Sequence, residues 1–407
     1  MLRGRPVRRR GAPAAAAGTT VKKAPWVRGE MVSQRSREAE LSGIRRMFEG
    51  APPNAINLGL GEPDFDPPPE VVEALVRAVR NGMNHYGPSA GLASLRAKIA
   101  ERYRDRLPST AAENVIVTGG GSEALMATAL ALYDPGDRVL VPNPGFVLYA
   151  PHARLAGATP VPYSLLESRR FLPDLDELER LVTPRTRALV VNSPSNPTGA
   201  VFPARLVERL VAFADAHDLT IVSDEVYEEI VYDGPCPSFW GRSDRVVIVN
   251  SFSKTLAMTG WRLGFLVAPR PLAIELNKMH YHIMACPSTP VQAAVLEGLS
   301  ADGGALARMV REFRARRDLV VRRLRAIPGA SVVSPDGAFY AFPRFDWERS
   351  STEISRGLLS RGVITTPGDA FGSLGAGHLR LSFAASRENL EKGLGILRTY
   401  GAERIAA

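Results

Sequence analysis

Lysine is scarce in this chain, because only six of its 51 basic Lys and Arg residues are lysines and the other 45 are arginines. An amine can lose its proton and attack a carbonyl carbon, whereas a guanidinium stays charged. A lysine in a polar turn of such a chain therefore suggests nucleophilic chemistry. The six lysines are Lys22, Lys23, Lys98, Lys254, Lys278 and Lys392.

Cysteine is scarcer still. Cys236 and Cys286 show neither the spacing of a metal site nor that of a disulfide framework, which suits a reducing cytoplasm. Long apolar runs are also missing, so no segment is predicted to span a bilayer and no membrane partner is expected.

Acidic residues are absent from the first 29 positions, which carry eight basic residues. The formal charge of the whole chain is +9, so the rest of the chain carries only +1. This balance argues against a body that binds nucleic acid. Residues 1–30 are predicted to be a basic arm, disordered because it is rich in Ala, Pro and Gly.

The most informative segment that is present reads Ser-Phe-Ser-Lys-Thr at residues 251–255 and continues to Gly-Trp-Arg at 260–262. The amine of Lys254 can form a Schiff base with an aldehyde. The hydroxyls of Ser251 and Ser253, together with the guanidinium of Arg262, suit a phosphate dianion. This combination suggests pyridoxal 5′-phosphate (PLP), and the alternative is a surface turn that happens to contain a lysine.

A second segment, residues 219–227, reads as a buried strand that ends in Asp224 and Tyr227. Ligands of open α/β sheets bind at the carboxyl ends of strands. A carboxylate there can keep a pyridine nitrogen protonated, so that the ring withdraws electrons. Tyr227 can donate to the phenolic oxygen of the ring. The alternative for Asp224 is a helix N-cap.

A third segment, residues 190–199, is an apolar run that enters a loop fixed by Pro and Gly. Asn196 precedes a proline, which favours an extended backbone, and its amide can donate to a cofactor oxygen or to a carboxylate. The alternative is an ordinary turn asparagine.

In order and spacing, these three segments resemble the class I and II aminotransferases of PLP fold type I. The family shows an Asn-Pro-x-Gly loop, an Asp-x-x-Tyr strand end, and a Ser-x-Ser-Lys loop with an arginine eight residues after the lysine. The resemblance covers about residues 42–397 and is greatest to the archaeal-type aromatic and aspartate aminotransferases. It also includes the stretches GEPDF, HYGPSAG, TGWRLGF and GAFYAFP.

The resemblance implies a role for each matching residue. Lys254 would bond to the cofactor, Asp224 would pair with the ring nitrogen, and Tyr227 and Asn196 would contact the ring oxygen. Ser251, Ser253 and Arg262 would hold the phosphate.

Backbone N–H groups at a helix start would complete the phosphate site at Gly121, Ser122 and Glu123, with the Glu123 side chain turned away from the phosphate. The alternative is a glycine-rich turn with a helix cap. Phe146 would stack on the ring, or simply pack in the core. Tyr86 would reach the phosphate of a neighbouring subunit, which implies a homodimer with shared active sites; otherwise it is a partly buried loop tyrosine.

The substrate end of the site depends on fewer residues. Arg380 lies between leucines on a predicted strand and needs an anionic partner or an exposed face. The family uses the matching residue to clamp the α-carboxylate of the substrate. Gly61 lies in the segment that resembles the loop closing over the substrate. No second arginine is assigned to a side-chain carboxylate, so the amino-acid pair stays open.

Apolar strand-like runs alternate with helical stretches, which predicts an α/β fold. The fold that the resemblance implies has a large domain with a mostly parallel sheet, residues 59–300, and a smaller α+β domain, residues 31–58 plus 301–407. A long arginine-rich helix is expected after a break near residues 301–304. The strand-like runs are residues 115–117, 139–141, 188–191, 220–222 and 246–249.

The function that we infer is transfer of an amino group between an α-amino acid of the aromatic or aspartate/glutamate type and a 2-oxo acid. PLP and pyridoxamine phosphate would carry the group, and Lys254 would act as general acid and base. The same residues would serve a PLP-dependent C–S β-lyase, because a fold does not fix a function. A PLP-binding sensor without catalysis is a third alternative.

Overall fold

The computed structural model describes residues 32–38, 51–52, 54–300 and 304–405, in a chain that divides into two units, residues 1–40 and 41–407. In the first unit, the described residues form one short helix, α1 (Gln34–Glu38). The predicted arm, residues 1–30, lies outside the described residues. Among the helices that are described, none combines the length and the apolar character needed to cross a membrane.

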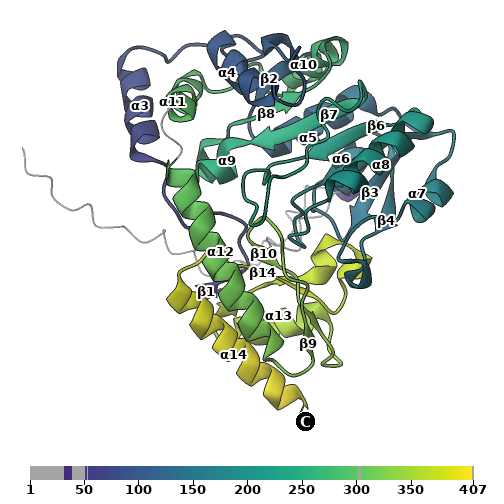
Figure 1. The fold of residues 1–407 in the computed structure, drawn as a ribbon, viewed down its shortest axis with the longest axis vertical. Helices are drawn as coiled ribbons and strands as arrows, with labels where there is room; N and C mark the ends of the chain where they lie inside the picture. The colour runs from purple at the N-terminus through teal and green to yellow at the C-terminus, as the bar shows by residue number, and fades with distance from the viewer. Residues whose placement is uncertain (1–31, 39–50, 53, 301–303, 406–407) are drawn as a thin grey trace, which may run out of the picture. The chain divides into compact units, whose positions relative to one another are not determined.

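The second unit is built around a seven-stranded sheet in the order β2-β8-β7-β6-β5-β3-β4 (Figure 1). Strand β8 runs antiparallel to both of its neighbours, and the other neighbouring pairs are parallel. This sheet with its flanking helices confirms the predicted fold class. The strands are β2 (Val115–Thr118), β3 (Arg138–Asn143), β4 (Thr159–Ser164), β5 (Thr186–Asn192), β6 (Thr220–Asp224), β7 (Val246–Ser251) and β8 (Gly264–Val267).

The five predicted strand-like runs all lie within strands of this sheet, at β2, β3, β5, β6 and β7. They read as continuous apolar runs because both faces of the sheet are covered, and every residue of β7 is buried. Strands β4 and β8 were not among the predicted runs. Strand β4 contains Pro160 and Pro162, and it lies at the sheet edge, where a proline is tolerated in a strand.

Helices cover both faces of the sheet. Successive side chains of β6 point to opposite faces. On one face, Ile221 belongs to an apolar cluster with residues of α4 (Ala93–Tyr103), α7 (Leu175–Leu181) and α8 (Ala204–Ala216). Val222 packs on the other face with α5 (Gly121–Leu132), α6 (Tyr149–Leu155) and α10 (Arg270–Met284). The alternation follows from the two-residue repeat of a strand.

The C-terminal elements gather around a separate apolar cluster that includes Phe313, Phe339 and Phe383. The long helix predicted after the break is confirmed as α12. The division into residues 59–300 and residues 31–58 plus 301–407 stays a prediction. These elements are α12 (Gly304–Arg325), β9 (Ala330–Ser331), β10 (Tyr340–Ala341), β11 (Arg344–Phe345), α13 (Ser351–Leu359), β12 (Val363–Ile364), β13 (Thr366–Pro367), β14 (Leu379–Ser382) and α14 (Arg387–Ile405).

Three further short strand groups complete the pairing. Strands β10, β14 and β13 form an antiparallel sheet, β9 pairs antiparallel with β11, and β1 pairs in parallel with β12. Strand β14 contains Arg380 at the position where a strand was predicted. The remaining elements are β1 (Ile56–Asn57), α3 (Pro69–Arg80), α9 (Phe252–Thr255) and α11 (Thr289–Ser300).

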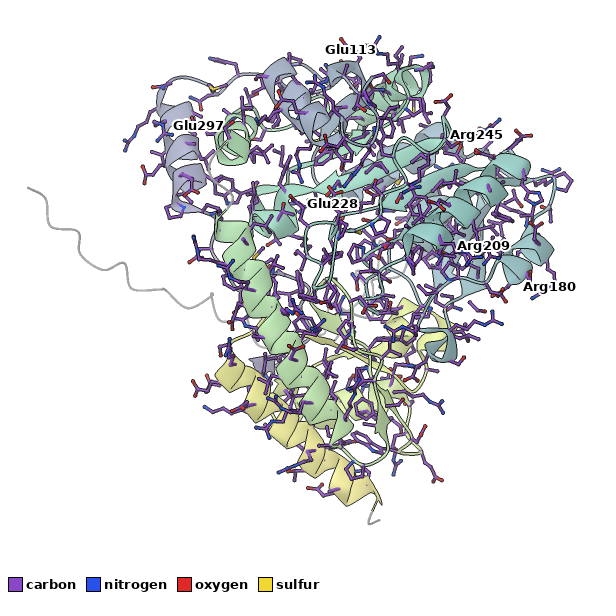
Figure 2. The ribbon with its side chains drawn as sticks, in the orientation of Figure 1. Glu113, Arg180, Arg209, Glu228, Arg245 and Glu297 are labelled. Atoms are coloured by element: carbon purple, nitrogen blue, oxygen red, sulfur yellow. The ribbon has the colours of Figure 1, made fainter. Side chains whose placement is uncertain are left out.

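Charged side chains are distributed unevenly between surface and interior. Arg180 and Arg245 lie at the periphery, as Figure 2 shows, and both are exposed. Glu228 lies inside the unit and is only 8% exposed (Figure 2). A buried carboxylate of this kind needs partners, because burial of a lone charge is strongly unfavourable.

The strand register brings the predicted polar residues to one edge of the sheet. Asn192 at the end of β5 lies opposite Asp224 at the end of β6. Ser251 at the end of β7 lies opposite Gly264, and Thr118 at the end of β2 lies opposite the same glycine. This is the edge at which open α/β sheets bind their ligands.

Candidate active site

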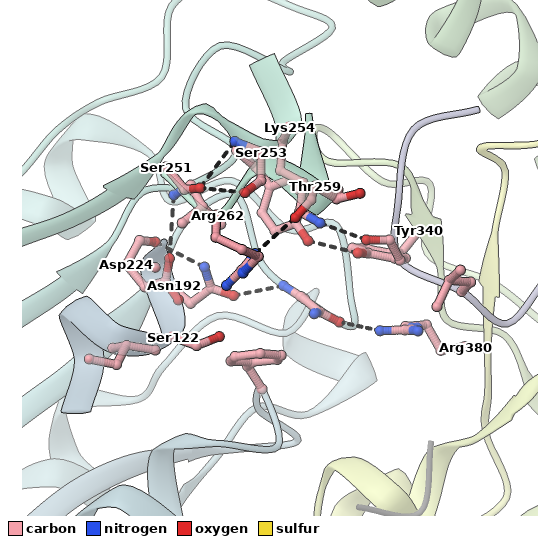
Figure 3. A pocket seen from close by; sticks show the side chains of 18 residues that line it. Ser122, Asn192, Asp224, Ser251, Ser253, Lys254, Thr259, Arg262, Tyr340 and Arg380 are labelled. Carbon is pink, nitrogen blue, oxygen red and sulfur yellow. Dashed lines mark hydrogen bonds between the residues drawn. The ribbon is translucent and has the colours of Figure 1, made fainter. Parts of the chain in front are cut away.

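A cavity of about 260 Å³ lies at this edge of the sheet (Figure 3). Twelve of the fourteen predicted site residues line it, and the other two, Glu123 and Tyr86, do not. In the view of Figure 3, Asp224 lies at one end and Arg380 at the other. The twelve are Gly61, Gly121, Ser122, Phe146, Asn196, Asp224, Tyr227, Ser251, Ser253, Lys254, Arg262 and Arg380.

Lys254 projects into this cavity from the short helix α9, which Ser251 caps by accepting a hydrogen bond from the Ser253 N–H at 3.1 Å. The Lys254 amine donates to the carbonyl of Gly61 at 2.6 Å. The pKa of Lys254 is lowered from 10.5 to about 8, mainly by burial and secondly by the nearby guanidinium of Arg380. A lowered pKa increases the unprotonated fraction that can attack a carbonyl near neutral pH.

Asp224 lies at the end of β6, and its carboxylate accepts a hydrogen bond from the Tyr149 hydroxyl at 2.7 Å. A second, longer bond comes from the Val226 N–H at 3.3 Å. Burial raises the pKa of Asp224 from 3.8 to about 6, although both hydrogen bonds oppose the rise. A buried carboxylate without a strong cationic partner is suited to receive a positively charged ring nitrogen.

Two asparagines hold the third predicted segment in place. The Asn192 amide donates to the carbonyl of Asp224 at 2.9 Å and to that of Pro194 at 3.1 Å. Its oxygen accepts the N–H of Asn196 at 2.7 Å. Asn192 therefore ties the loop to the end of β6, while the Asn196 side chain stays directed toward the cavity.

Tyr227 is paired with a second tyrosine, because its hydroxyl lies 2.7 Å from that of Tyr340. Their rings meet edge to face with centroids 5.7 Å apart. Gly61 lies directly beside Tyr340, and a Cβ at position 61 would collide with the Tyr340 hydroxyl. The close approach of the loop to the cavity therefore requires a glycine at this position.

Arg380 is only 2% exposed, and none of the described acidic residues pairs with it. Its guanidinium donates to the Asn196 side-chain oxygen at 3.0 Å and to the carbonyl of Gly59. It also lies over the ring of Tyr340, 4.6 Å from the centroid, and its Nε has no partner. Because buried guanidinium groups ordinarily pair with anions, this arrangement suits a carboxylate ligand.

A second cationic region surrounds the start of α5. Arg262 lies so close to Gly120 that a Cβ at position 120 would fall 2.6 Å from its Nη2. Gly120 also has a φ of +100°, which glycine adopts readily. As the first two residues of α5, Gly121 and Ser122 have no carbonyl four residues earlier in the helix for their N–H groups. A helix start beside an arginine is suited to hold a phosphate.

The two predicted residues outside the cavity differ in their surroundings. The Glu123 side chain turns toward Gly119, whose N–H it accepts at 3.0 Å, and its own N–H donates to the Gly120 carbonyl at 3.1 Å. The backbone donors that line the cavity are therefore those of Gly121 and Ser122. Tyr86 is 93% exposed, and its role in a neighbouring subunit stays a prediction.

Sequence reasoning did not single out Tyr149, Asn192 or Tyr340. Tyr340 lies within the GAFYAFP stretch that contributed to the resemblance, and Asn192 directly follows a predicted strand run, so both carried a signal. Tyr149 follows Phe146 by three residues at the start of α6, and nothing in its local sequence points to Asp224. The contact of Tyr149 with Asp224 depends on where α6, which follows β3 in the chain, packs on the sheet.

The family described as Aminotransferase class I and II matches residues 53–397 of this chain. The probable aspartate aminotransferase of Methanocaldococcus jannaschii is 40% identical over 375 residues, which cover 90% of this chain and 99% of that protein. The aromatic-amino-acid aminotransferase 2 of Thermococcus litoralis is 41% identical, covering 89% and 96%. A solved aromatic aminotransferase from Pyrococcus horikoshii has a TM-score of 0.83 at 38% identity, covering 89% and 100%. These similarities confirm the resemblance that the motifs indicated.

Proposed function

Because the chain belongs to the class I and II aminotransferases and is a transaminase, we propose that it binds PLP in the cavity at the sheet edge. When bound, PLP supplies an aldehyde that bonds to an amine and a pyridine ring that withdraws electrons from the substrate. The main support for this proposal is that the amine of Lys254 is buried in this cavity and has a lowered pKa. Burial lowers its pKa to about 8, in a cavity that also contains an acid and two arginines.

Each end of the cofactor has suitable partners among the lining residues. Asp224 keeps the ring nitrogen protonated, and Tyr227 and Asn196 donate to the ring oxygen. Ser251, Ser253 and Arg262 would hold the phosphate, with the N–H groups of Gly121 and Ser122 as further donors. Phe146 packs against the ring.

The substrate is held by its α-carboxylate, which the Arg380 guanidinium binds through two parallel charge-assisted hydrogen bonds. Asn196 already accepts a hydrogen bond from Arg380 at 3.0 Å, so it fixes the orientation of the guanidinium. Lys254 would then take the proton from the α-carbon of the substrate and donate it at the C4′ carbon of the cofactor, acting as base and acid in turn.

The substrate pair is an α-amino acid of the aromatic or aspartate/glutamate type and the corresponding 2-oxo acid. Support comes from the relatives, whose names include both aspartate and aromatic-amino-acid aminotransferases. Aromatic contact is available from Tyr340 and Phe146, which both line the cavity.

The chain functions as a homodimer in the cytoplasm, with Tyr86 of one subunit contacting the cofactor phosphate of the other. The 93% exposure of Tyr86 supports a contact outside its own chain, and the free thiols of Cys236 and Cys286 suit a reducing compartment. Light scattering under assay conditions tests the dimer, and a fully active monomer would contradict it.

A single half-reaction tests the proposed activity. The purified enzyme, saturated with PLP, is mixed with a stoichiometric amount of an amino acid, and the absorbance of the cofactor is followed. Conversion of PLP to pyridoxamine phosphate with release of one equivalent of 2-oxo acid is expected. Release of ammonia and pyruvate from a cysteine conjugate, without aminated cofactor, would indicate a C–S lyase instead.

A panel of donors in the same experiment identifies the substrate class. Aspartate, glutamate, tyrosine and phenylalanine are compared by their single-turnover rate constants. An absence of turnover with all four would contradict the proposed substrate classes while leaving cofactor binding intact.

A further inference from the structure

His280 is a fully buried histidine that lies outside the cavity and has no role in the proposed mechanism. It belongs to α10, and its two ring nitrogens connect that helix to two other segments. Nε2 lies 2.9 Å from the carbonyl oxygen of Ser89, and Nδ1 lies 3.0 Å from a carboxylate oxygen of Glu123. Ser89 follows Tyr86 by three residues, and Glu123 is the third residue of α5.

The hydrogen-bond partners of His280 determine how many protons His280 and Glu123 hold together. A carbonyl can only accept, so Nε2 of His280 must carry a proton. The contact between Nδ1 and Glu123 also needs one, because an unprotonated nitrogen and an ionised carboxylate are both acceptors. Whether the second proton lies on the histidine or on the carboxyl group, the pair carries no net charge.

This neutrality matters because of the position of Glu123. The two residues before it, Gly121 and Ser122, line the cavity at the start of α5, beside Arg262. An ionised glutamate one residue further along the helix would oppose a dianion held there, because like charges repel strongly where water is excluded. The other Glu123 oxygen accepts the Gly119 N–H at 3.0 Å, so the carboxyl group is fixed in this position.

We propose that His280 is a positioning residue for the phosphate site: it supplies the proton that cancels the charge of Glu123 and so permits the start of α5 to bind the cofactor's phosphate. The inference rests on the proposed function, since the phosphate is that of PLP. In this proposal His280 does not contact any ligand. The effect of His280 on PLP affinity therefore depends on the charge of Glu123, and this dependence distinguishes the proposed role from a purely structural one.

The experiment is a double-mutant cycle on the apoprotein, read by the equilibrium affinity for PLP and for pyridoxal, which lacks the phosphate. The single variant His280→Gln keeps a donor for the Ser89 carbonyl but leaves Glu123 without its proton. Its PLP dissociation constant should rise about tenfold or more, while that for pyridoxal changes less than about twofold, because only the phosphate carries the opposing charge. The double variant Glu123→Gln/His280→Gln should return to within about threefold of Glu123→Gln alone.

The outcomes distinguish three cases. If His280→Gln weakens PLP binding equally with and without the Glu123 charge, the histidine is merely structural and the proposal is wrong. If His280→Gln has no effect on PLP affinity, the proposal is also wrong. If the wild-type apoprotein binds PLP no better than pyridoxal, the proposed phosphate site itself fails. Should circular dichroism show that His280→Gln does not fold, His280→Asn replaces it in the cycle, since its amide can bond to Glu123 without supplying a charge.

Discussion

Asp224 and Glu225 are adjacent in the chain, but their carboxylates lie in different surroundings. Asp224 lines the cavity and accepts one side-chain hydrogen bond, from Tyr149. Glu225 is turned away from the cavity and accepts hydrogen bonds from two hydroxyls, those of Ser223 at 2.9 Å and Ser238 at 2.8 Å. It also accepts the Phe239 N–H at 3.0 Å.

The surroundings of Glu225 include further charged groups that satisfy one another. Arg106 lies 3.9 Å from Glu225 and 2.9 Å from Glu228. Glu228 also accepts from Tyr103 at 3.2 Å and from Asn250 at 2.7 Å. This group, which we call the Arg106–Glu228 network, joins α4 to the segments that carry Asp224 and Ser251.

An arginine of the Arg106–Glu228 network and an arginine of the cavity also differ in their charged partners. Arg106 has two carboxylates within 4 Å, whereas Arg380 has none among the described residues, although it is the more deeply buried. A buried charge costs free energy unless it is paired. Charges in the network satisfy one another, whereas the unpaired charges at the cavity are available to a ligand.

Lys254→Ala should have the largest effect on activity, because Lys254 is the one lysine among the described residues that line the cavity. Transamination should fall by about four orders of magnitude or more, since the residue serves both as cofactor ligand and as acid/base. The loss is measured as kcat/KM. The matched control is Lys278→Ala, which removes an exposed lysine paired with Glu275 and should leave kcat/KM within about twofold.

Asp224→Asn and Glu225→Gln should affect different properties of the enzyme, although the two residues are adjacent. Asp224→Asn should slow the single-turnover rate by a factor of about 10²–10³, because the ring loses the charge that stabilises its protonated nitrogen. Glu225→Gln should leave this rate within about tenfold but lower the free energy of unfolding by about 1–3 kcal/mol. A wild-type rate in Asp224→Asn would remove that residue from the mechanism.

The lowered pKa of Lys254 predicts a pH-dependent stability of the apoprotein. The folded state binds fewer protons than the unfolded state between pH 8 and 10.5, so stability rises with pH across that window. Below pH 8 the penalty is about 3 kcal/mol, at about 1.4 kcal/mol per pKa unit. Lys254→Met should therefore gain stability relative to wild type at pH 7, and the difference should shrink by about that amount toward pH 10.5.

Chemical denaturation at several pH values measures this difference. Lys278→Met is the control and should show a difference from wild type that does not vary with pH over the same range. A constant difference for Lys254→Met as well would mean that the amine is not buried in the apoprotein.

Arg380→Lys should have the smallest of these effects, because it keeps the charge and loses only the planar fork. Truncation of one partner of such a pair costs roughly 2–5 kcal/mol, so kcat/KM should fall about thirtyfold or more for aromatic and acidic donors alike. Arg106→Lys, in the network, should change the unfolding free energy rather than kcat/KM. A loss confined to aspartate and glutamate would assign Arg380 to the side-chain carboxylate instead.

The sequence predicted most of the sheet and the family. Continuous apolar runs identify β3, β5, β6 and β7 because those strands are covered on both faces, and the polar residue at each strand end marks the binding edge. Strand β4 could not be recognised in the same way, since its prolines argue against a strand until its edge position is known.

Side-chain pairing was harder to predict than strand position. The motifs named fourteen candidate residues, of which twelve line the cavity, yet the contact of Tyr149 with Asp224 joins residues 75 positions apart. The link between His280 and Glu123 spans 157 positions. Such contacts depend on how helices pack across a sheet face, and no local spacing or composition encodes that packing.

Reduction with borohydride tests whether the unpaired groups of the cavity form the cofactor site. The enzyme saturated with PLP is reduced, which makes the bond between cofactor and lysine permanent, and is then digested and mapped by mass spectrometry. The pyridoxyl label should appear on Lys254 alone, in the peptide that contains Ser251 and Ser253. A label on Lys98, Lys278 or Lys392, with Lys254 unmodified, would contradict the account.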